Sequence, residues 1–558
     1  MFARAFTWTV TAVMMLLIVR VVQLQIRPEA SLAAKLGMQR SQRPQPARRG
    51  GIFDARRRYL AVSQTAVRLF ADPKLIKDPP AFAQTVADTL GYDAATIEKV
   101  VTRRPDSHYV VIDPKLSEER LASVMTLNLK GLGTQRWVER RYPQDHYAGQ
   151  LLGTVGFDGQ GLEGLEFLFQ KELAGRSSSV SYLRDVRRRP LQVAGPDYQP
   201  PTDGADVQLS IDLVIQSIAE QVLADRCRRF EAEHGQMIVM DPRTGYILAM
   251  VNYPSFDPSQ LEGSKPEQRR NRCVTDVFEP GSIFKPFVWA WATEHGLAYP
   301  AEIIDCTTSG VHRTSRGRRL RDVRPHGRIT WQEVLVYSSN IGMSIVGERM
   351  GASTMFNGLC AFGFGGPSGS ELPGESHGIV NPLDGWNHYS VTSVPMGQEV
   401  AVTALQLVRA LCAIANDGLM ATPTIRADRD AMDDPILMRV LSKATARLTR
   451  SAMRRVVIEG TGRKANSNLY SIFGKTGTAQ VPDLENGGYH DDQYVASFIA
   501  GAPVDDPRIV VGCFIHRPSK KSYYGGTVAA PGVMRVIERS LVYLGVAPQR
   551  SHENDGTI

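Results

Sequence analysis

A long apolar segment at the start of the chain predicts a membrane anchor. Residues 6–19 carry no charge, and the apolar run continues past Arg20 to Ile26. As a helix, residues 6–26 would span about 31 Å, which matches the hydrocarbon core of a bilayer. A cleavable signal peptide is the alternative, but its apolar part is usually only about 7 to 15 residues long and is followed by small residues, which Val22–Ile26 lacks. We predict a retained single-pass helix over residues 6–26, after a cytoplasmic tail of residues 1–5.

The charges beside this segment do not settle its orientation. Arg4 is the sole positive side chain before it, whereas Arg27, Lys35, Arg40 and Arg43 follow it. Applied literally, the positive-inside rule would place the large domain in the cytosol. Large domains can translocate regardless of flanking charge, so the orientation depends on the chemistry of the site.

The pattern then changes to mixed helical and strand periodicity. Residues 27–48 are polar, basic and proline-punctuated, as expected of a juxtamembrane linker. Within residues 49–200, alternation at 108–112 predicts a strand, while apolar spacing at 81–90 and 162–173 predicts helices. This first folded region is therefore expected to be α+β.

A second region, residues 201–546, shows a hairpin, a helical middle and late strands, before a polar tail at 547–558. Two apolar runs joined by a D-P-x-T-G turn form the hairpin signal. Thr403 and Gln406 form a capping box that opens an apolar helix. The pattern predicts one antiparallel sheet flanked by helices. The predicted elements are helices at 213–230, 403–416 and 532–544, and strands at 236–240, 246–250, 473–480, 494–500 and 508–516.

Composition excludes intrinsic disorder as the main state. The 558 residues are 43% hydrophobic and 22% charged, with a net charge of +8. Seven arginines lie between Arg313 and Arg328, which could suggest nucleic acid. We favour a solvated basic loop and predict no nucleic-acid partner.

Six cysteines are scattered without a C-x-x-C pair or a histidine cluster. We therefore expect neither a metal site nor a cofactor. An even number permits disulfides in an exported chain, but buried free thiols are the favoured interpretation because a large core needs no cross-links.

The first motif with chemical potential is Glu279-Pro-Gly-Ser282-Ile-Phe-Lys285. Pro280 and Gly281 break what precedes, so Ser282 would begin a helix, with Lys285 on the same face about 5 to 6 Å away. An amine at that reach can take the hydroxyl proton if burial or a second cation lowers its pKa. Alone, such a pattern could be an ordinary helix start.

The second motif is Ser338-Ser-Asn340, which can present a hydroxyl and an amide on one side of a loop. On its own it could equally be a polar helix-capping turn.

The third motif, Lys475-Thr-Gly-Thr478, falls in a predicted strand. Alternation puts Thr476 and Thr478 on one side and Lys475 on the other. Glycine inside a strand marks a close approach, so Gly477 would admit substrate or the Ser282 helix. Alone, this motif could be any basic strand end.

Together and in this order, S-x-x-K, S-x-N and K-T-G are typical of penicillin-recognising serine acyltransferases. The chain resembles the class B penicillin-binding proteins, monofunctional DD-transpeptidases of bacterial cell-wall synthesis, over nearly its whole length. After Asp54 the family's usual Arg-Asn-Gly turn is replaced by Ala55-Arg56-Arg57. Further segments that carry the resemblance are Arg49–Asp54, Gly161–Glu166, Leu209–Asp212, Asp241–Gly245, Asn271-Arg272, Leu372–Glu375, Gly525-Gly526 and Ala529–Pro531.

The resemblance implies a fold and a mechanism. The fold would be α+β: one transmembrane helix, an α+β pedestal of the dimerisation type over residues 49–200, and a transpeptidase domain over 201–546. The implied roles are Ser282 as nucleophile, Lys285 as general base, Ser338 as proton relay, Asn340 as the group that holds the substrate amide and Lys285, Lys475 as the source of the local field, Thr476, Gly477 and Thr478 as substrate-binding residues, and the backbone N–H groups of Ser282 and Thr478 as the oxyanion hole.

The implied substrates are peptidoglycan stem peptides ending in D-Ala-D-Ala, and β-lactam antibiotics would acylate the same serine. The catalytic domain would then lie outside the cytoplasmic membrane. Met396–Val400 before Thr403 resembles division-associated or sporulation members, whose partners would include a polytopic SEDS-type glycosyltransferase and other division proteins. The Glu-Asp-x-x-Phe signature of bifunctional enzymes is absent from residues 27–200.

Two alternatives stay open. A serine β-lactamase or a β-lactam sensor would share all three motifs, although the N-terminal pedestal argues against both. A non-catalytic division scaffold would show decay of the catalytic set, and here every polar group is present.

Overall fold

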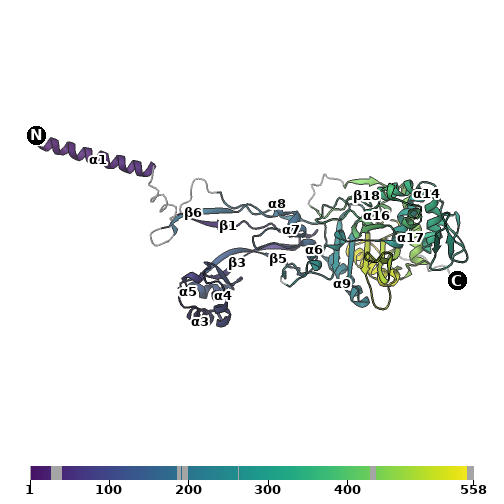
Figure 1. Cartoon of the computed structure of the whole chain (residues 1–558), viewed down its shortest axis with the longest axis horizontal. Coiled ribbons are helices and arrows are strands. Elements are labelled where there is room, and N and C mark those ends of the chain that lie inside the picture. The colour runs from purple at the N-terminus through teal and green to yellow at the C-terminus, as the bar shows by residue number, and fades with distance from the viewer. Residues whose placement is uncertain are drawn as a thin grey trace. The chain divides into compact units, whose positions relative to one another are not determined.

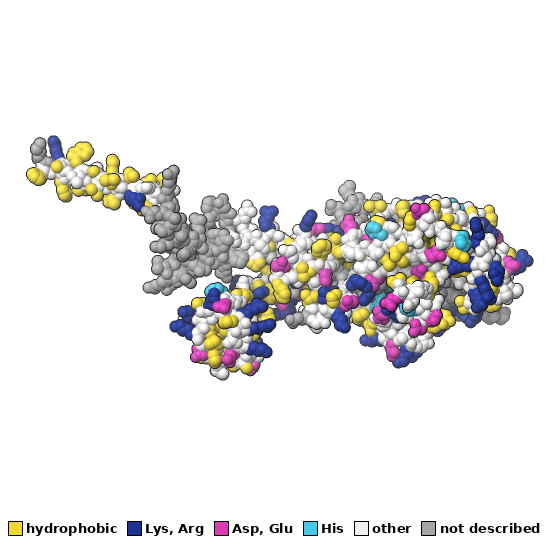
Figure 2. Space-filling model, viewed as in Figure 1, with side chains coloured by type: hydrophobic (Ala, Val, Ile, Leu, Met, Phe, Trp, Pro, Cys, Tyr) yellow, Lys and Arg dark blue, Asp and Glu magenta, His cyan; other side chains and the backbone are white. Residues whose placement is uncertain are grey.

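The N-terminal apolar segment forms helix α1 (Phe2–Ile26) in the computed structural model, which describes residues 2–26, 40–184, 190–191, 199–261, 263–427 and 435–549. Hydrophobic side chains cover the helix along its length (Figure 2), its mean hydropathy is 2.0, and it is long enough to cross a membrane. The hydroxyl of Thr7 donates to the carbonyl of Ala3, so that polar group is satisfied within the helix. The helix begins at Phe2, so most of the expected tail at residues 1–5 is helical.

Residues 27–39 of the predicted linker and 550–558 of the predicted polar tail lie outside the described residues. The chain divides into two compact units. Unit 1 comprises residues 1–49, 64–139 and 174–205, and unit 2 comprises 50–63, 140–173 and 206–558.

Unit 2 thus includes two stretches that we had expected to belong to the pedestal, residues 50–63 and 140–173. The reason is their apolar side chains. Ile52, Leu151 and Leu165 are fully or almost fully buried in the same hydrophobic cluster as Leu209 and Ile238.

Unit 1 contains a small α+β lobe. Its core is formed by apolar side chains from three helices, among them Phe82, Val86 and Ile97. The predicted helix at 81–90 and strand at 108–112 are confirmed with slightly shifted ends. Strand β4 (Val110–Asp113) pairs with β3 (Tyr59–Ala71), and β5 (Leu132–Arg141) pairs with β3 as well. A separate ribbon consists of β1 (Arg40–Gln45), β6 (Ser178–Arg184) and β7 (Pro190–Leu191). The helices are η1 (Pro73–Leu75), α3 (Pro79–Leu90), α4 (Ala94–Thr102) and α5 (Glu118–Thr126).

Unit 2 is built on the predicted antiparallel sheet, which is confirmed. Its five strands lie in the order β10-β9-β22-β21-β20, and every neighbouring pair is antiparallel. The K-T-G motif therefore lies on an edge strand. The strands are β9 (His234–Met240), β10 (Ile247–Tyr253), β20 (Phe473–Pro482), β21 (Tyr489–Ala502) and β22 (Ile509–His516).

Helices cover both faces of this sheet (Figure 1). Along β9, Met237 and Val239 face one hydrophobic cluster while Ile238 and Met240 face the other, as strand alternation requires. One face packs against α9 (Leu213–Phe230) and α19 (Ala530–Tyr543), and the other packs against α16 (Ala404–Ala415). Thr403 and Gln406 form the predicted capping box of α16.

The remaining elements of unit 2 are short or belong to the helical middle. They are β2 (Ile52–Phe53), β8 (Val207–Gln208), α6 (Gly149–Leu152), α10 (Pro266–Arg269), α11 (Arg272–Thr275), β11 (Val277–Phe278), η2 (Gly281–Phe284), α12 (Lys285–Glu294), β12 (Ile303–Asp305), β13 (Val311–Arg313), β14 (Arg319–Arg321), β15 (Arg328–Thr330), α13 (Trp331–Val336), α14 (Asn340–Ala361), β16 (Ile379–Val380), η3 (Leu383–Gly385), α15 (Ser390–Ser393), η4 (Val394–Met396), β17 (Val400–Thr403), β18 (Leu419–Ala421), β19 (Leu437–Arg439), α17 (Lys443–Ile458), η5 (Arg463–Ala465) and α18 (Gly525–Val528).

One predicted helix is wrong in its extent. Residues 162–173 form two short helices, α7 (Gly164–Leu168) and α8 (Gln170–Leu173), separated at Phe169. Gly164 has a φ of 59°, and a Cβ there would lie 2.5 Å from the carbonyl oxygen of Leu151. The chain therefore cannot be helical from residue 162 onward.

The turn that departs from the family pattern nevertheless closes. The N–H of Asp54 donates to the carbonyl of Arg58 at 2.9 Å, and Arg57 adopts a left-handed φ of 60°. Arg58 pairs with both Asp54 and Asp212. Arg57 thus stands where the family usually has a glycine, and the ion pairs of the next residue, Arg58, with these two carboxylates hold the turn in place.

All six cysteines are free thiols. Five are buried, as expected, but Cys360 is exposed.

Candidate active site

The nucleophile motif forms a tight turn that leads directly into a helix. Gly281–Phe284 is a 3-10 turn (η2), and α12 follows at once from Lys285. With three residues per turn, side chains three apart share one face. The predicted helix start is therefore found as a 3-10 turn that begins one residue before Ser282, at Gly281. Ser282 is half-buried and Lys285 is fully buried.

Lys285 points at the second motif. Its Nζ donates to the carbonyl of Ser338 at 2.7 Å, to Ser338 Oγ at 3.2 Å and to Asn340 Oδ1 at 2.7 Å. Burial lowers the pKa of Lys285 to about 7, while the nearby carboxylate of Asp322 acts in the opposite direction. An amine in this state can exchange a proton near neutral pH.

Ser338 occupies the short connection between α13 and α14. It has a φ of 62°, a left-handed conformation that is costly for a residue with a Cβ. Lys475 Nζ donates to Ser338 Oγ at 3.0 Å and to the carbonyl of Thr476 at 3.0 Å. The Ser338 hydroxyl therefore lies between two buried amines. Burial, with the neighbouring charge of Lys285, lowers the pKa of Lys475 well below its usual value.

The third motif places its two threonines on one face of β20. Thr476 Oγ1 lies 2.6 Å from Thr461 Oγ1, and Thr478 Oγ1 accepts the N–H of Gly525 at 3.1 Å. Thr476 is largely buried and Thr478 is half-buried. Three hydroxyls thus line this part of the strand, and Thr461 was not identified from the sequence.

Gly477 is where the strand meets the nucleophile turn. A Cβ on Gly477 would lie 2.4 Å from Ser497 Oγ, 2.8 Å from Ile283 Cγ2 and 3.2 Å from the carbonyl oxygen of Pro280. The predicted close approach of the Ser282 turn is therefore confirmed, and β21 comes equally close.

The arginine-rich segment is only partly the solvated loop that we expected. Six of its seven arginines are exposed, but the segment takes part in two short strand pairs: β13 with β14, and β15 with the preceding strand β12. Arg318 is half-buried and donates to Thr392 Oγ1 at 2.8 Å and to Ser393 Oγ at 2.5 Å. Asp322 contacts the second motif. Sequence reasoning missed both residues because only the strand pairing brings them inward.

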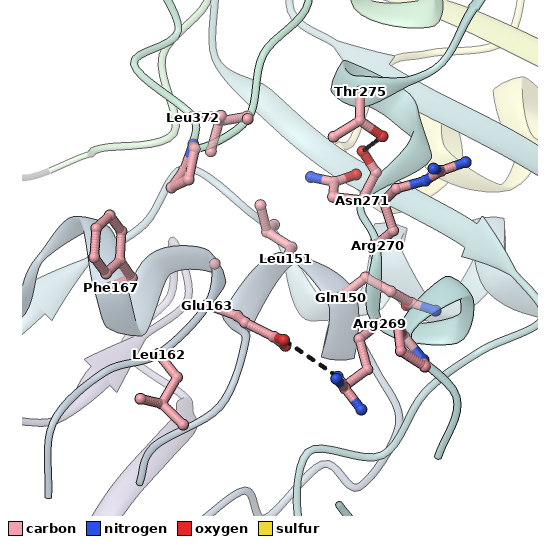
Figure 3. A pocket seen from close by; sticks show the side chains of 14 residues that line it. Gln150, Leu151, Leu162, Glu163, Phe167, Arg269, Arg270, Asn271, Thr275 and Leu372 are labelled. Carbon is pink, nitrogen blue, oxygen red and sulfur yellow. Dashed lines mark hydrogen bonds and ion pairs between the residues drawn. The ribbon is translucent and has the colours of Figure 1, made fainter.

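A cavity of 390 Å³ elsewhere in unit 2 is lined by none of the candidate catalytic residues. In Figure 3, the side chains of Glu163 and Arg269 point toward each other, and they form an ion pair with 3.2 Å between Oε1 and Nε. Leu162 and Phe167 are apolar residues of the same lining. The catalytic candidates instead gather where η2, the Ser338 connection and β20 meet.

Comparisons with known proteins match this architecture. A family model for the penicillin-binding protein transpeptidase domain matches residues 235–538, and one for the penicillin-binding protein dimerisation domain matches residues 44–209. The combination defines a transpeptidase with a separate dimerisation domain and an N-terminal apolar helix.

The chain belongs to the class B penicillin-binding proteins, the transpeptidases of peptidoglycan synthesis. Stage V sporulation protein D of Bacillus subtilis is 33% identical over 519 residues, which cover 90% of this chain and 79% of the relative. Penicillin-binding protein PbpB of Mycobacterium tuberculosis is 32% identical over 537 residues, which cover 89% of this chain and 78% of the relative. The crystal structure of penicillin-binding protein 3 from Mycobacterium tuberculosis, complexed with aztreonam, superposes with a TM-score of 0.71 at 28% identity and covers 91% of this chain and 98% of that one.

Proposed function

We propose that this protein is a serine-type peptidoglycan D,D-transpeptidase. The observation that carries the proposal is the convergence of the three motifs: both buried lysines donate to Ser338 Oγ, and Lys285 lies one 3-10 turn after Ser282. The relatives include proteins named as probable peptidoglycan D,D-transpeptidases, such as PenA of Neisseria meningitidis, which is 31% identical and of which the chain covers 86%. This supports the same reaction here.

In the proposed reaction, Ser282 Oγ attacks the carbonyl carbon of the D-Ala-D-Ala peptide bond while Lys285 accepts its proton. The backbone N–H groups of Ser282 and Thr478 stabilise the oxyanion. The C–N bond then breaks, and Ser338 passes the proton to the leaving D-Ala amine. The resulting ester is attacked by an amine of a second stem peptide, which releases Ser282 and forms the cross-link.

Substrate recognition follows from the same geometry. The terminal carboxylate of the donor peptide would accept hydrogen bonds from Thr476 and Thr478, which share one face of β20. The lysine charge next to them favours an anion. Penicillin carries a carboxylate and a strained amide in a similar arrangement, so we propose that it acylates Ser282.

Covalent labelling tests this assignment. The full chain in detergent, incubated with a fluorescent penicillin, should gain one adduct at Ser282 by peptide mass spectrometry and hold it for many minutes. Ser282→Ala should remain folded and unlabelled, because the change removes a single oxygen. The wild type should also release D-Ala from a peptide ending in D-Ala-D-Ala.

Other results would identify other functions. Rapid multiple turnover of the penicillin would indicate a β-lactamase. A folded wild type that is never labelled would indicate a non-catalytic scaffold, and labelling of Ser282→Ala at the wild-type rate would overturn the assignment of the nucleophile.

We further propose that the catalytic domain lies outside the cytoplasmic membrane, where the uncross-linked stem peptides are. Alkaline phosphatase, which is active only after export, should be active when fused to the C-terminus. Activity of a cytosol-only reporter at the same position would show instead that the adverse charges beside α1 set the orientation.

A role in septal or sporulation wall synthesis is the finer part of the proposal. It is supported by the Met396–Val400 segment and by similarity to a protein named for stage V of sporulation. A SEDS-type glycosyltransferase would then be a partner, together with other division proteins. Depletion of the protein should produce filaments or blocked spores, whereas round or swollen cells would indicate an elongation role. In a separate experiment, such a partner should co-purify with the protein.

A further inference from the structure

One carboxylate outside the three motifs contacts the second of them. Asp322 lies directly after β14, at the N-terminal end of the long helix α14. Its Oδ2 accepts the hydroxyl of Ser339 at 2.6 Å, and its Oδ1 accepts the N–H of Asn340 at 2.5 Å and that of Ile341 at 3.1 Å. All three donors belong to the Ser338–Ile341 connection.

The residue before Asp322 fixes the other end of Asn340. The carbonyl of Arg321 accepts the Asn340 Nδ2 group at 3.3 Å, which leaves Asn340 Oδ1 facing Lys285 Nζ at 2.7 Å. Two consecutive residues therefore hold both the backbone and the side chain of Asn340. The orientation of its amide follows from these contacts.

The segment that carries Asp322 is itself held in place. β13 pairs with β14, and the N–H of Asp322 donates to the carbonyl of Gly310 at 3.1 Å. Leu320, two residues earlier, is buried. The carboxylate is thus presented from an ordered hairpin, and Ser338 is held in its left-handed conformation between α13 and the residues that Asp322 anchors.

The charged groups around Lys285 come from two elements. Lys475 on β20 shares the Ser338 hydroxyl with it, and Asp322 is the carboxylate that acts on it from the hairpin. The nearby Cys306 thiol is neutral because burial raises its pKa. At the N-terminus of a helix, an anion such as Asp322 is also favoured by the helix dipole.

We propose that Asp322 is a positioning residue for acylation: its carboxylate holds the Ser338–Asn340 connection against Lys285, and its charge stabilises the protonated form of that lysine. The proposal rests on the proposed function. It predicts an effect with a definite sign. Without the negative charge, the Lys285 ammonium is less stable, so the amine stays neutral to lower pH.

The test compares Asp322→Asn with Asp305→Asn in the full chain in detergent. Asp305 ends β12, before the β13–β14 hairpin, and is exposed, and its side chain accepts the N–H of Thr307. The Asp305→Asn variant therefore removes an equal negative charge that does not contact the Ser338–Ile341 connection. The second-order rate of labelling by fluorescent penicillin is measured from pH 5 to 9. Asp322→Asn should shift the acid limb of this profile to lower pH by about 0.5 to 1 unit, whereas Asp305→Asn should leave the limb where it is.

The outcomes separate this inference from the proposed function. If the wild type is labelled at Ser282 and the acid limb of Asp322→Asn is unchanged or moves to higher pH, the inference is wrong and the function stands. If the wild type is not labelled at any pH, both fall. A drop in plateau rate and melting temperature without a shift of the limb would reveal a purely structural role and would also overturn the inference.

A second variant covers the case in which Asp322→Asn does not fold. Ser339→Ala removes one of the three contacts and keeps the charge, and it also removes the cap that Ser339 Oγ provides for the N–H of Gly342 at the start of α14. It should lower the plateau rate of labelling about tenfold to a hundredfold, in line with one lost hydrogen bond to a charged group, without moving the acid limb. An unchanged plateau rate would overturn the positioning role.

Discussion

The two lysines beside Ser338 are alike in burial and differ in their surroundings. Both are fully buried, and both donate to the same hydroxyl, at 3.2 Å from Lys285 and 3.0 Å from Lys475. Lys285 stands at the start of helix α12 and has two further oxygen acceptors, with Asp322 nearby. Lys475 stands on strand β20, and its other acceptor is the carbonyl of Thr476.

This difference suggests how one hydroxyl can serve two amines. Two ammonium groups that share one oxygen repel each other, so the pair titrates as a unit and holds a neutral amine near pH 7. The carboxylate beside Lys285 tunes that member, while Lys475 is tied to the strand that would bind the substrate carboxylate. The helix side is thus suited to proton transfer, and the strand side is suited to holding an anion.

The largest expected effect comes from removing each lysine in turn. Lys285→Ala should lower the rate of acylation by penicillin about 10²-fold to 10⁴-fold, as for loss of a positioned general base. Lys475→Ala should cost less, about tenfold to a hundredfold, because it removes a nearby charge rather than the base. Stopped-flow labelling of the two variants measures both rates.

Lys464→Ala is the matched control for this pair. Lys464 is exposed and donates to Thr527 Oγ1 at 3.1 Å in the same part of unit 2, so its loss should leave the rate unchanged. A greater loss in Lys475→Ala than in Lys285→Ala would reverse the assignment of the base.

The second prediction concerns pH. Because burial lowers the pKa of Lys285 to about 7, the amine is protonated and inactive as a base below that pH and neutral above it. The acylation rate should therefore rise about tenfold per unit up to about pH 7 and then level off. In Lys475→Ala the acid limb should move to higher pH, because a repelling charge is gone. A limb that stays fixed in this variant would show that the two lysines do not interact.

Much of this site could be predicted from the sequence because its chemistry is local. The spacing of Ser282 and Lys285 within one turn, and the alternation of Lys475 and Thr476 along one strand, depend on backbone geometry alone. The hairpin, the antiparallel sheet and helix α9 were predicted from periodicity and turn residues for the same reason.

What the sequence did not reveal depends on contacts between distant segments. Asp322 lies among arginines, and only the β13–β14 pairing brings its carboxylate to Asn340. Thr461 carries no pattern of its own, yet its hydroxyl reaches Thr476. The assignment of residues 50–63 to unit 2 likewise follows from burial against Leu209, which periodicity cannot show.

A third prediction tests how closely the helix side and the strand side must meet. Gly477→Ala would place a Cβ 2.4 Å from Ser497 Oγ and 2.8 Å from Ile283 Cγ2. Such overpacking costs about 1 to 3 kcal/mol, and relief by moving the Ser282 turn should also slow acylation. Denaturant unfolding and labelling rates measure the two effects. Gly366→Ala is the control, because its Cβ would meet nothing within 4 Å; equal behaviour of the two variants would contradict the close approach.

The smallest expected effect lies on the strand side, at Thr461. Thr461→Val keeps the shape of the side chain and removes the hydroxyl that lies 2.6 Å from Thr476 Oγ1. Loss of one hydrogen bond of about 1 kcal/mol should raise the penicillin concentration for half-maximal acylation about fivefold. The saturating rate should change little, because the proton-transfer groups around Lys285 are untouched. Thr89→Val, whose hydroxyl donates only to the carbonyl of Thr85 in α3, should change neither quantity. A fall in the saturating rate of Thr461→Val without a change in half-saturation would place Thr461 with the proton-transfer groups and remove the distinction between the two sides of Ser338.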